Sequence, residues 1–200
     1  MTRPRLIGLT GRAGSGKSTV ARLLCEQQAF VEVAFAAPVK RALAAMLDLP
    51  PETFDDPAWK NSPIPWLRGT SPRRLMQTLG TGWGRQMIAD DLWLILAERR
   101  IAHLTARAER LHISGIVVSD VRYENEAALV RRLGGTVWHL VRAAPPVEAH
   151  DSEAGIAAQP GDRTLDNTGS TEQLEIGIDR LLHAALALGG SVIQPTVTRQ

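Results

Sequence analysis

The sequence predicts a three-layer α/β fold, in which a parallel sheet of about five strands is flanked by helices and carries a small lid. Segments with strand and helix patterns alternate along the chain, and a glycine-rich turn joins the first expected strand to the first expected helix. A later apolar segment, Gly115–Asp120, ends on an acidic residue. Strands that are separated by helices pair in parallel and are covered on both faces. We therefore expect functional groups at the carboxyl edge of one sheet.

Length and composition limit the function classes. The chain has 200 residues, of which 44% are hydrophobic and 22% charged, as in an ordinary soluble domain. We expect one domain over residues 1–188 and a flexible tail at 189–200. No segment resembles a membrane span or a signal peptide, which predicts a cytoplasmic protein. A net charge of +2 argues against a general nucleic-acid surface, and the single cysteine, Cys25, excludes an intrachain disulfide.

The expected helices and strands follow from the spacing of hydrophobic residues and from the positions of Gly and Pro. Residues 48–70 hold five prolines and predict a long irregular connection, and Ser71-Pro72 is a typical helix start. We expect a second irregular, lid-like stretch over about 142–166. The regular elements that we expect are strands at about 5–10, 31–35, 115–120 and 136–141, and helices at about 17–28, 38–47, 71–80, 84–112, 123–133 and 171–188.

A phosphate-binding loop, or P-loop, follows the first expected strand. The sequence Gly11-Arg12-Ala13-Gly14-Ser15-Gly16-Lys17-Ser18 fills every position of the G-x-x-x-x-G-K-[ST] motif. Glycines let backbone N–H groups face a polyphosphate, and the N-terminus of the following helix favours an anion. Lys17 should reach the β- and γ-phosphates of ATP, Ser18 should ligate Mg²⁺, and Thr19 could contact the α-phosphate.

Asp120 stands where a second metal-binding acid is expected, at the carboxyl end of an apolar strand. A carboxylate there would hold Mg²⁺ directly or through water. The alternative is that Asp120 caps the helix that begins near Tyr123. Elsewhere the His and Cys residues show no metal-ligand spacing, so we expect any metal to arrive with the nucleotide.

Several segments together resemble the bacteriophage-type deoxynucleoside monophosphate kinases, which belong to the P-loop nucleoside monophosphate kinase superfamily. The resemblance runs in order from about residue 5 to residue 170 and is more specific than the P-loop alone. It rests on the segments Ala34–Lys40, Arg73–Arg85, Asp91–Trp93, Asp120–Ala127, His150–Glu153 and Asp166–Gly169.

The resemblance implies that ATP donates its γ-phosphoryl group to a deoxynucleoside 5′-monophosphate, a step in deoxynucleotide biosynthesis. Residues of about 48–93 would form most of the acceptor site, and Asp120 would lie at the metal. The acceptor-binding residues implied in this way are Arg73, Arg74, Gln77, Gly80, Thr81, Trp93, Arg122 and Glu126. The resemblance also suggests a homodimer and a phage or prophage setting; the apolar positions between Asp90 and Leu111 fit either a dimer surface or a core face.

The chemistry agrees with this implication, because a phosphate acceptor needs positioning and positive charge rather than a general base. Adjacent helical residues diverge by about 100°, so Arg73 and Arg74 cannot both face the acceptor, and we favour Arg73. Lys40 and Arg142 are further candidates for phosphate contact, with exposed surface positions as the alternative. Lys17, Arg73, Arg122 and Arg142 are thus the expected catalytic cations.

The other predicted acceptor residues also have simpler explanations. Gln77 could contact a base edge, and Trp93 could stack on the base or belong to the core beside Leu92 and Leu94. Glu126 could instead form an ion pair on a helix surface. Two other functions stay open: another P-loop small-molecule kinase, such as a dephospho-coenzyme A kinase or an adenylate kinase, and a nucleotide-dependent switch.

Overall fold

A parallel sheet forms the centre of the molecule. The computed structural model describes residues 3–142 and 156–188. The sheet contains five strands in the order β2-β3-β1-β4-β5, and every neighbouring pair is parallel. The predicted parallel α/β fold of about five strands is therefore confirmed. The strands are β1 (Arg5–Thr10), β2 (Phe30–Val33), β3 (Gly115–Val118), β4 (Thr136–Val141) and β5 (Arg163–Asp166).

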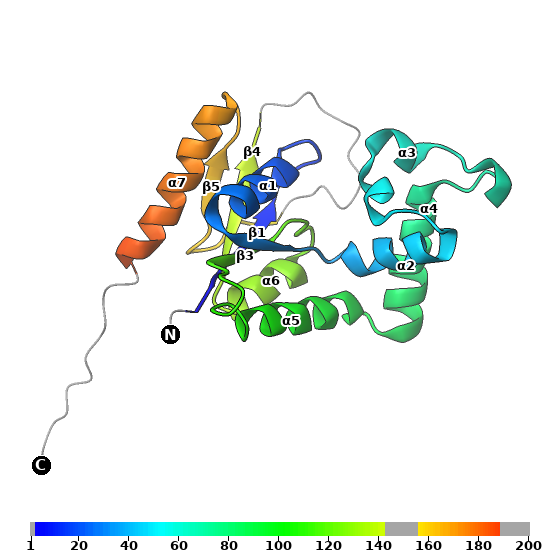
Figure 1. The fold of residues 1–200 in the computed structure, drawn as a ribbon, viewed down its shortest axis with the longest axis horizontal. Coiled ribbons are helices and arrows are strands. Elements are labelled where there is room, and N and C mark those ends of the chain that lie inside the picture. The colour runs from blue at the N-terminus through cyan, green and yellow to red at the C-terminus, as the bar shows by residue number, and fades with distance from the viewer. Residues whose placement is uncertain (1–2, 143–155, 189–200) are drawn as a thin grey trace, which may run out of the picture.

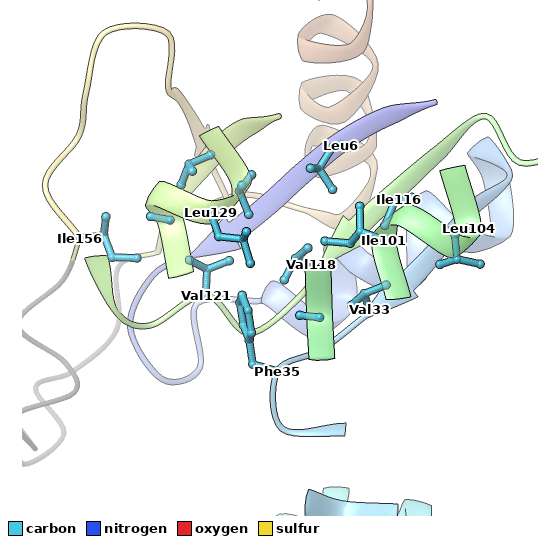
Figure 2. Packing of buried hydrophobic residues seen from close by; sticks show 14 residues of the cluster. Leu6, Val33, Phe35, Ile101, Leu104, Ile116, Val118, Val121, Leu129 and Ile156 are labelled. Atoms are coloured by element: carbon cyan, nitrogen blue, oxygen red, sulfur yellow. The ribbon is translucent and has the colours of Figure 1, made fainter. Parts of the chain in front are cut away.

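Helices cover both faces of the sheet (Figure 1). Helices α1 (Lys17–Gln28) and α7 (Thr171–Leu188) lie on one face, and α5 (Leu92–Thr105) and α6 (Glu124–Arg132) lie on the other. Successive side chains of a strand point to opposite faces. Accordingly Leu6 of β1 packs in the cluster that contains Ile101 and Leu129, as Figure 2 shows, whereas Leu9 packs with α1 and α7.

A group of helices that begins with α2 lies beyond the end of β2 and forms a third apolar cluster (Figure 1). Its buried residues are Val39, Leu43, Ala44, Phe54 and Trp93, and Phe54 meets the Trp59 ring edge-on at a centroid distance of 5.1 Å. The helices are α2 (Ala37–Leu47), α3 (Pro57–Asn61), α4 (Pro72–Gln77), a π-helix (Thr78–Ile88) and two 3-10 helices (Pro51–Asp55 and Pro65–Leu67). We call these helices the helical subdomain.

The local patterns located most elements correctly, and the errors have physical causes. Residues 48–70 are not irregular, because Pro51, Pro57 and Pro65 each stand in the first turn of a short helix. Ser71 caps α4 as predicted, since its hydroxyl accepts the Arg74 N–H at 3.3 Å, but beyond Gln77 the chain continues as a π-helix instead of ending at Gly80.

Part of the expected lid-like stretch also proved to be regular. Residues 163–166 form the edge strand β5, which pairs with β4, although their sequence has no apolar alternation. The part of that stretch at 143–155, which includes the His150–Glu153 segment, and the expected tail at 189–200 lie outside the described residues. Among the described helices, none is long and apolar enough to cross a membrane.

A buried ion-pair network ties α6, β4 and the chain before β5 together. The Asp162 carboxylate, whose side chain is 5% exposed, accepts hydrogen bonds from Arg131 Nη2 at 2.7 Å, His139 Nε2 at 2.9 Å and the Gln159 N–H at 2.9 Å. Burial alone would raise the pKa of this carboxyl, but these hydrogen bonds outweigh burial and hold the pKa well below its ordinary value. The network therefore anchors β5 through the ionised form of Asp162.

Replacing Asp162 by Asn should lower the free energy of unfolding by about 2 kcal/mol at pH 7, because Arg131 loses a charged partner. A carboxyl whose folded pKa is depressed stabilises the fold above its unfolded pKa of about 3.9, and this contribution is lost as the pH falls below that value. We would measure urea unfolding of the original protein and of Asp162→Asn between about pH 7 and pH 3. The difference between their free energies of unfolding should become smaller below about pH 4. A difference that stays constant or grows on acidification would contradict the stabilising role of ionised Asp162.

Candidate active site

The P-loop occupies the turn between β1 and α1, where the sequence predicts it. Gly14 and Gly16 have φ of 75° and 98°, in the left-handed region that favours glycine. No side chain caps the first turn of α1 among the described residues, and the position of a Cβ on Gly14 faces open space. These features leave backbone donors at a helix N-terminus available to an anion, so the loop fits a polyphosphate.

Lys17 and Ser15 complete the loop. The Lys17 ammonium donates to the carbonyl oxygens of Gly11 at 2.6 Å and Arg12 at 2.9 Å, which holds the side chain across the loop. The Ser15 hydroxyl is buried and, within the described part of the chain, has no hydrogen-bond partner. Ala13 and Ser18 are exposed, and Thr19 is half-buried in the first turn of α1. The Ser18 hydroxyl is therefore accessible to a ligand on the open side.

The ends of β4 and β5 reach the P-loop from the sheet. Arg142, directly after β4, lies with Nη1 3.4 Å from the Gly14 carbonyl oxygen. Asn167, directly after β5, donates from Nδ2 to the Ser15 carbonyl oxygen at 2.9 Å. Arg142 thus lies beside the phosphate-binding loop, as its proposed role requires, whereas Asn167 was not among the predicted site residues.

Asp120 lies at the carboxyl edge of the sheet, but it does not cap α6. Its two carboxylate oxygens accept the N–H groups of Phe35 at 2.8 Å and Ala36 at 3.0 Å, just before α2. The alternative, that Asp120 caps the helix that begins near Tyr123, is therefore wrong. Asp120 instead joins the end of β3 to the start of α2. Each oxygen still has a lone pair that could face a cation.

Three helices and the chain before α6 bring four cations near one another, namely Lys40 of α2, Lys60 of α3, Arg73 of α4 and Arg122, and we call them the cation cluster. Burial lowers the pKa of the Lys60 ammonium, and the charges of Lys40, Arg122 and Arg73 lower it further, while Asp55 opposes them. Lys40 forms an ion pair with Asp55. Like charges that are held together in this way create a site for an anion.

Neighbouring contacts fix the cation cluster in place. Arg73 Nε donates to Asn61 Oδ1 at 2.8 Å, so α4 is tied to the residue next to Lys60. The N–H of Val121, beside Arg122, donates to the carbonyl oxygen of Leu9 at 3.2 Å, so Arg122 lies next to the end of β1. Arg73 and Arg74 are both exposed, but only Arg73 is among the charges that act on Lys60, which favours Arg73.

Lys60 is the cluster member that sequence reasoning missed, because it lies in a proline-rich stretch expected to be irregular. The amino-acid composition nevertheless contained a signal that pointed to Lys60. Among 23 basic residues only Lys17, Lys40 and Lys60 are lysines. One of these lies in the P-loop and the other two in the cation cluster, so every lysine of this arginine-rich chain lies at the candidate site.

Glu126 is buried rather than on a helix surface. Its side chain is 3% exposed and accepts the N–H groups of Arg122 at 2.8 Å and Tyr123 at 3.2 Å, and Arg85 Nη2 lies 3.2 Å from Oε1. Burial raises the pKa of the Glu126 carboxyl, and these N–H groups oppose that rise. The alternative, an ion pair of Glu126 on a helix surface, was correct about an arginine partner but wrong about the exposed position. The partner, Arg85, belongs to the π-helix. Glu126 fixes the backbone at Arg122.

Trp93 belongs to the core, as its alternative interpretation held, and the structure argues against a stacking role. The side chain is 7% exposed, Nε1 donates to the Gly80 carbonyl oxygen at 2.7 Å, and the ring lies so close to Gly84 that a Cβ there would be 2.3 Å from it. Long π-helices are rare and often mark functional sites. Trp93 thus supports the π-helix that carries Gly80 and Thr81, while Gln77 is exposed at the end of α4.

The fold and the loop are those of the P-loop kinases, and comparison with known proteins identifies the family. The family model described as deoxynucleotide monophosphate kinase matches residues 66–178. A protein of Acanthamoeba polyphaga mimivirus, named "Putative deoxynucleotide monophosphate kinase", is 32% identical over 153 residues, which are 73% of this chain and 77% of that protein. The chain belongs to the deoxynucleotide monophosphate kinase family, as the sequence resemblance indicated.

Two further comparisons agree. The deoxynucleotide monophosphate kinase of Escherichia phage RB69 is 32% identical over 114 residues, which are 56% of this chain and 45% of the phage protein. The match therefore spans less than half of that relative. A crystal structure from Chloroflexus aurantiacus aligns over 94% of this chain and 98% of its own, with a TM-score of 0.51 and 15% identity, which shows a shared fold.

Replacing Trp93 by Phe tests its role. The variant keeps an apolar ring but loses the indole N–H to Gly80, so the free energy of unfolding should fall by about 1 kcal/mol. The KM for a deoxynucleoside monophosphate should stay within about twofold of the original. Trp83→Phe is the matched control, because Trp83 is exposed on the same π-helix. A higher KM with unchanged stability would restore the stacking role.

Proposed function

We propose that this chain transfers the γ-phosphoryl group of ATP to a deoxynucleoside 5′-monophosphate and so forms a deoxynucleoside diphosphate and ADP. The observation that carries the proposal is the cation cluster, in which Lys40, Arg73 and Arg122 act on Lys60 and Asp55 offsets only part of their charge. The names of the viral relatives describe the same acceptor class. This match favours a nucleotide acceptor over dephospho-coenzyme A and favours an enzyme over a switch.

The P-loop would bind the donor. Backbone N–H groups of the P-loop would face the β- and γ-phosphates, and Lys17, whose ammonium donates to loop carbonyl oxygens, would supply a point charge to them. Ser18 and Asp120 offer hard oxygen ligands that fit Mg²⁺, which neutralises phosphate charge when it is bound. In the described ranges no cluster of three or more His, Cys, Asp or Glu residues could hold a metal without the nucleotide.

The cation cluster would bind the phosphate of the acceptor. Arg122 lies beside the end of β1, the strand that leads into the P-loop, and therefore links the two sites. Arg142, directly after β4, lies against the P-loop and could contact the group in transfer. The phosphate oxygen of the acceptor is already ionised, so catalysis requires alignment and charge neutralisation and no general base.

The remaining assignments are also proposals. Gln77, Gly80 and Thr81, near the end of α4, would contact the sugar and base, and Glu126 would act by holding Arg122. Residues 1–188 would act as one domain, with 48–93 forming the acceptor side and 142–166 the lid. We further propose a cytoplasmic homodimer from a phage or prophage, for which the exposed apolar side chains of Ile95 and Leu96 on α5 offer a contact surface.

The proposal predicts that deoxynucleoside monophosphates stimulate ADP release. The purified protein with Mg-ATP should release ADP rapidly with one or more of dAMP, dGMP, dCMP and dTMP, and far less with AMP or GMP. Lys17→Ala should reduce the rate by at least about a hundredfold with the fold retained. Stimulation by dephospho-coenzyme A alone, or a slow ADP release that no acceptor changes, would overturn the proposal.

Replacing Lys60 by Ala should raise the KM for the monophosphate about tenfold to a hundredfold, because a charge-assisted phosphate contact is lost. The KM for ATP should not change, and Lys60→Arg should recover much of the loss. Arg41→Ala is the control, since Arg41 is exposed on α2, the helix that carries Lys40. Equal increases in both KM values would remove Lys60 from the acceptor site.

A further inference from the structure

Asn167 contacts the P-loop from outside the loop, at the end of β5. Its side-chain Nδ2 donates to the Ser15 carbonyl oxygen at 2.9 Å. The sheet fixes Asn167 itself, because its backbone N–H donates to the Val141 carbonyl oxygen at 2.8 Å, one residue beyond the β4–β5 pair Val141 and Asp166. The amide of Asn167 is thus a rigid donor that the sheet presents to the loop.

The geometry of the peptide bond gives this contact a consequence. In a trans peptide the carbonyl group of one residue and the N–H of the next point in opposite directions. A hydrogen bond that holds the Ser15 carbonyl group toward Asn167 therefore turns the Gly16 N–H away from Asn167. Within residues 3–142 and 156–188 that N–H makes no hydrogen bond of its own. It remains available to a phosphate at the N-terminus of α1.

The fit between the two residues is close. A Cβ on Gly16 would lie 2.1 Å from Asn167 Nδ2, and Gly16 has a φ of 98°. A side chain at residue 16 would therefore push Asn167 away from Ser15 and would also strain the backbone. Glycine at this position serves the contact with Asn167 as well as the turn.

We propose that Asn167 is a positioning residue of the donor site, which orients the Gly16 N–H toward the phosphates of ATP by holding the Ser15 carbonyl group. The inference rests on the proposed kinase function. Asn167 acts through the loop and does not touch the reacting atoms. A carboxylate of the same shape would reverse the effect, because it would face the Ser15 carbonyl oxygen with another acceptor and add negative charge beside the phosphates.

The test compares Asn167→Ala and Asn167→Asp with the original protein by calorimetric titration of Mg-ATP and by steady-state kinetics. Asn167→Ala should weaken ATP binding about fivefold to tenfold, as expected for one lost hydrogen bond, and Asn167→Asp should weaken it further. The KM for the monophosphate at saturating ATP should not change. Gln27→Ala is the control, because the Gln27 amide bonds to Glu175 between α1 and α7.

The outcomes separate this inference from the proposed function. If the original protein binds ATP and phosphorylates a monophosphate but both Asn167 variants bind ATP equally well, only the role of Asn167 is overturned. Equal losses for ATP and for the monophosphate would show that Asn167 merely supports the fold, which also overturns the proposal. If the original protein binds no ATP, the proposed function fails together with the inference.

Discussion

Parallel pairing of β1 with β3 and β4 is the constraint on which the site depends. Because all the strands run in one direction, their carboxyl ends lie at one edge, and the segments that follow them meet there. The P-loop follows β1, Asp120 and Arg122 follow β3, Arg142 follows β4 and Asn167 follows β5. The hydrogen bonds from Asn167 to Ser15 and from Val121 to Leu9 then hold these segments together. The positions of Asp120, Arg122 and Arg142 therefore result from sheet topology more than from any one side chain.

Charged groups in this molecule fall into two kinds, and the difference separates structure from function. Arg131 and Asp162 satisfy each other beneath the surface, and the depressed pKa of the Asp162 carboxyl shows that the fold stabilises its charged form. The cation cluster has the opposite character, since burial and like charges lower the pKa of Lys60. A fold that keeps such cations close together is completed electrostatically by an anion. The phosphate of a nucleotide would supply that charge, which makes the cluster the physical basis of the proposed acceptor site.

Local sequence signals predicted the parts of the structure that depend on local chemistry. The P-loop motif, the bounds of α1 and the Ser71 cap follow from glycine, charge and capping preferences within a few residues, and the sequence was sufficient for them. Strand β5 could not be found in this way, because an edge strand without apolar alternation is defined by its partner β4. The π-helix depends on the distant Trp93, and the role of Lys60 depends on the packing of α3 against α4. Long-range contacts of this kind leave almost no local pattern in the sequence.

The most direct test of the account follows the phosphoryl group itself. ATP labelled at the γ-phosphate would be incubated with the protein, Mg²⁺ and a deoxynucleoside monophosphate, and the labelled products would be separated. The account predicts that the label enters the deoxynucleoside diphosphate in proportion to the ADP formed, because the P-loop and the cation cluster hold donor and acceptor at one edge of the sheet. Label that is found only in inorganic phosphate, at a rate that the monophosphate does not change, would contradict it.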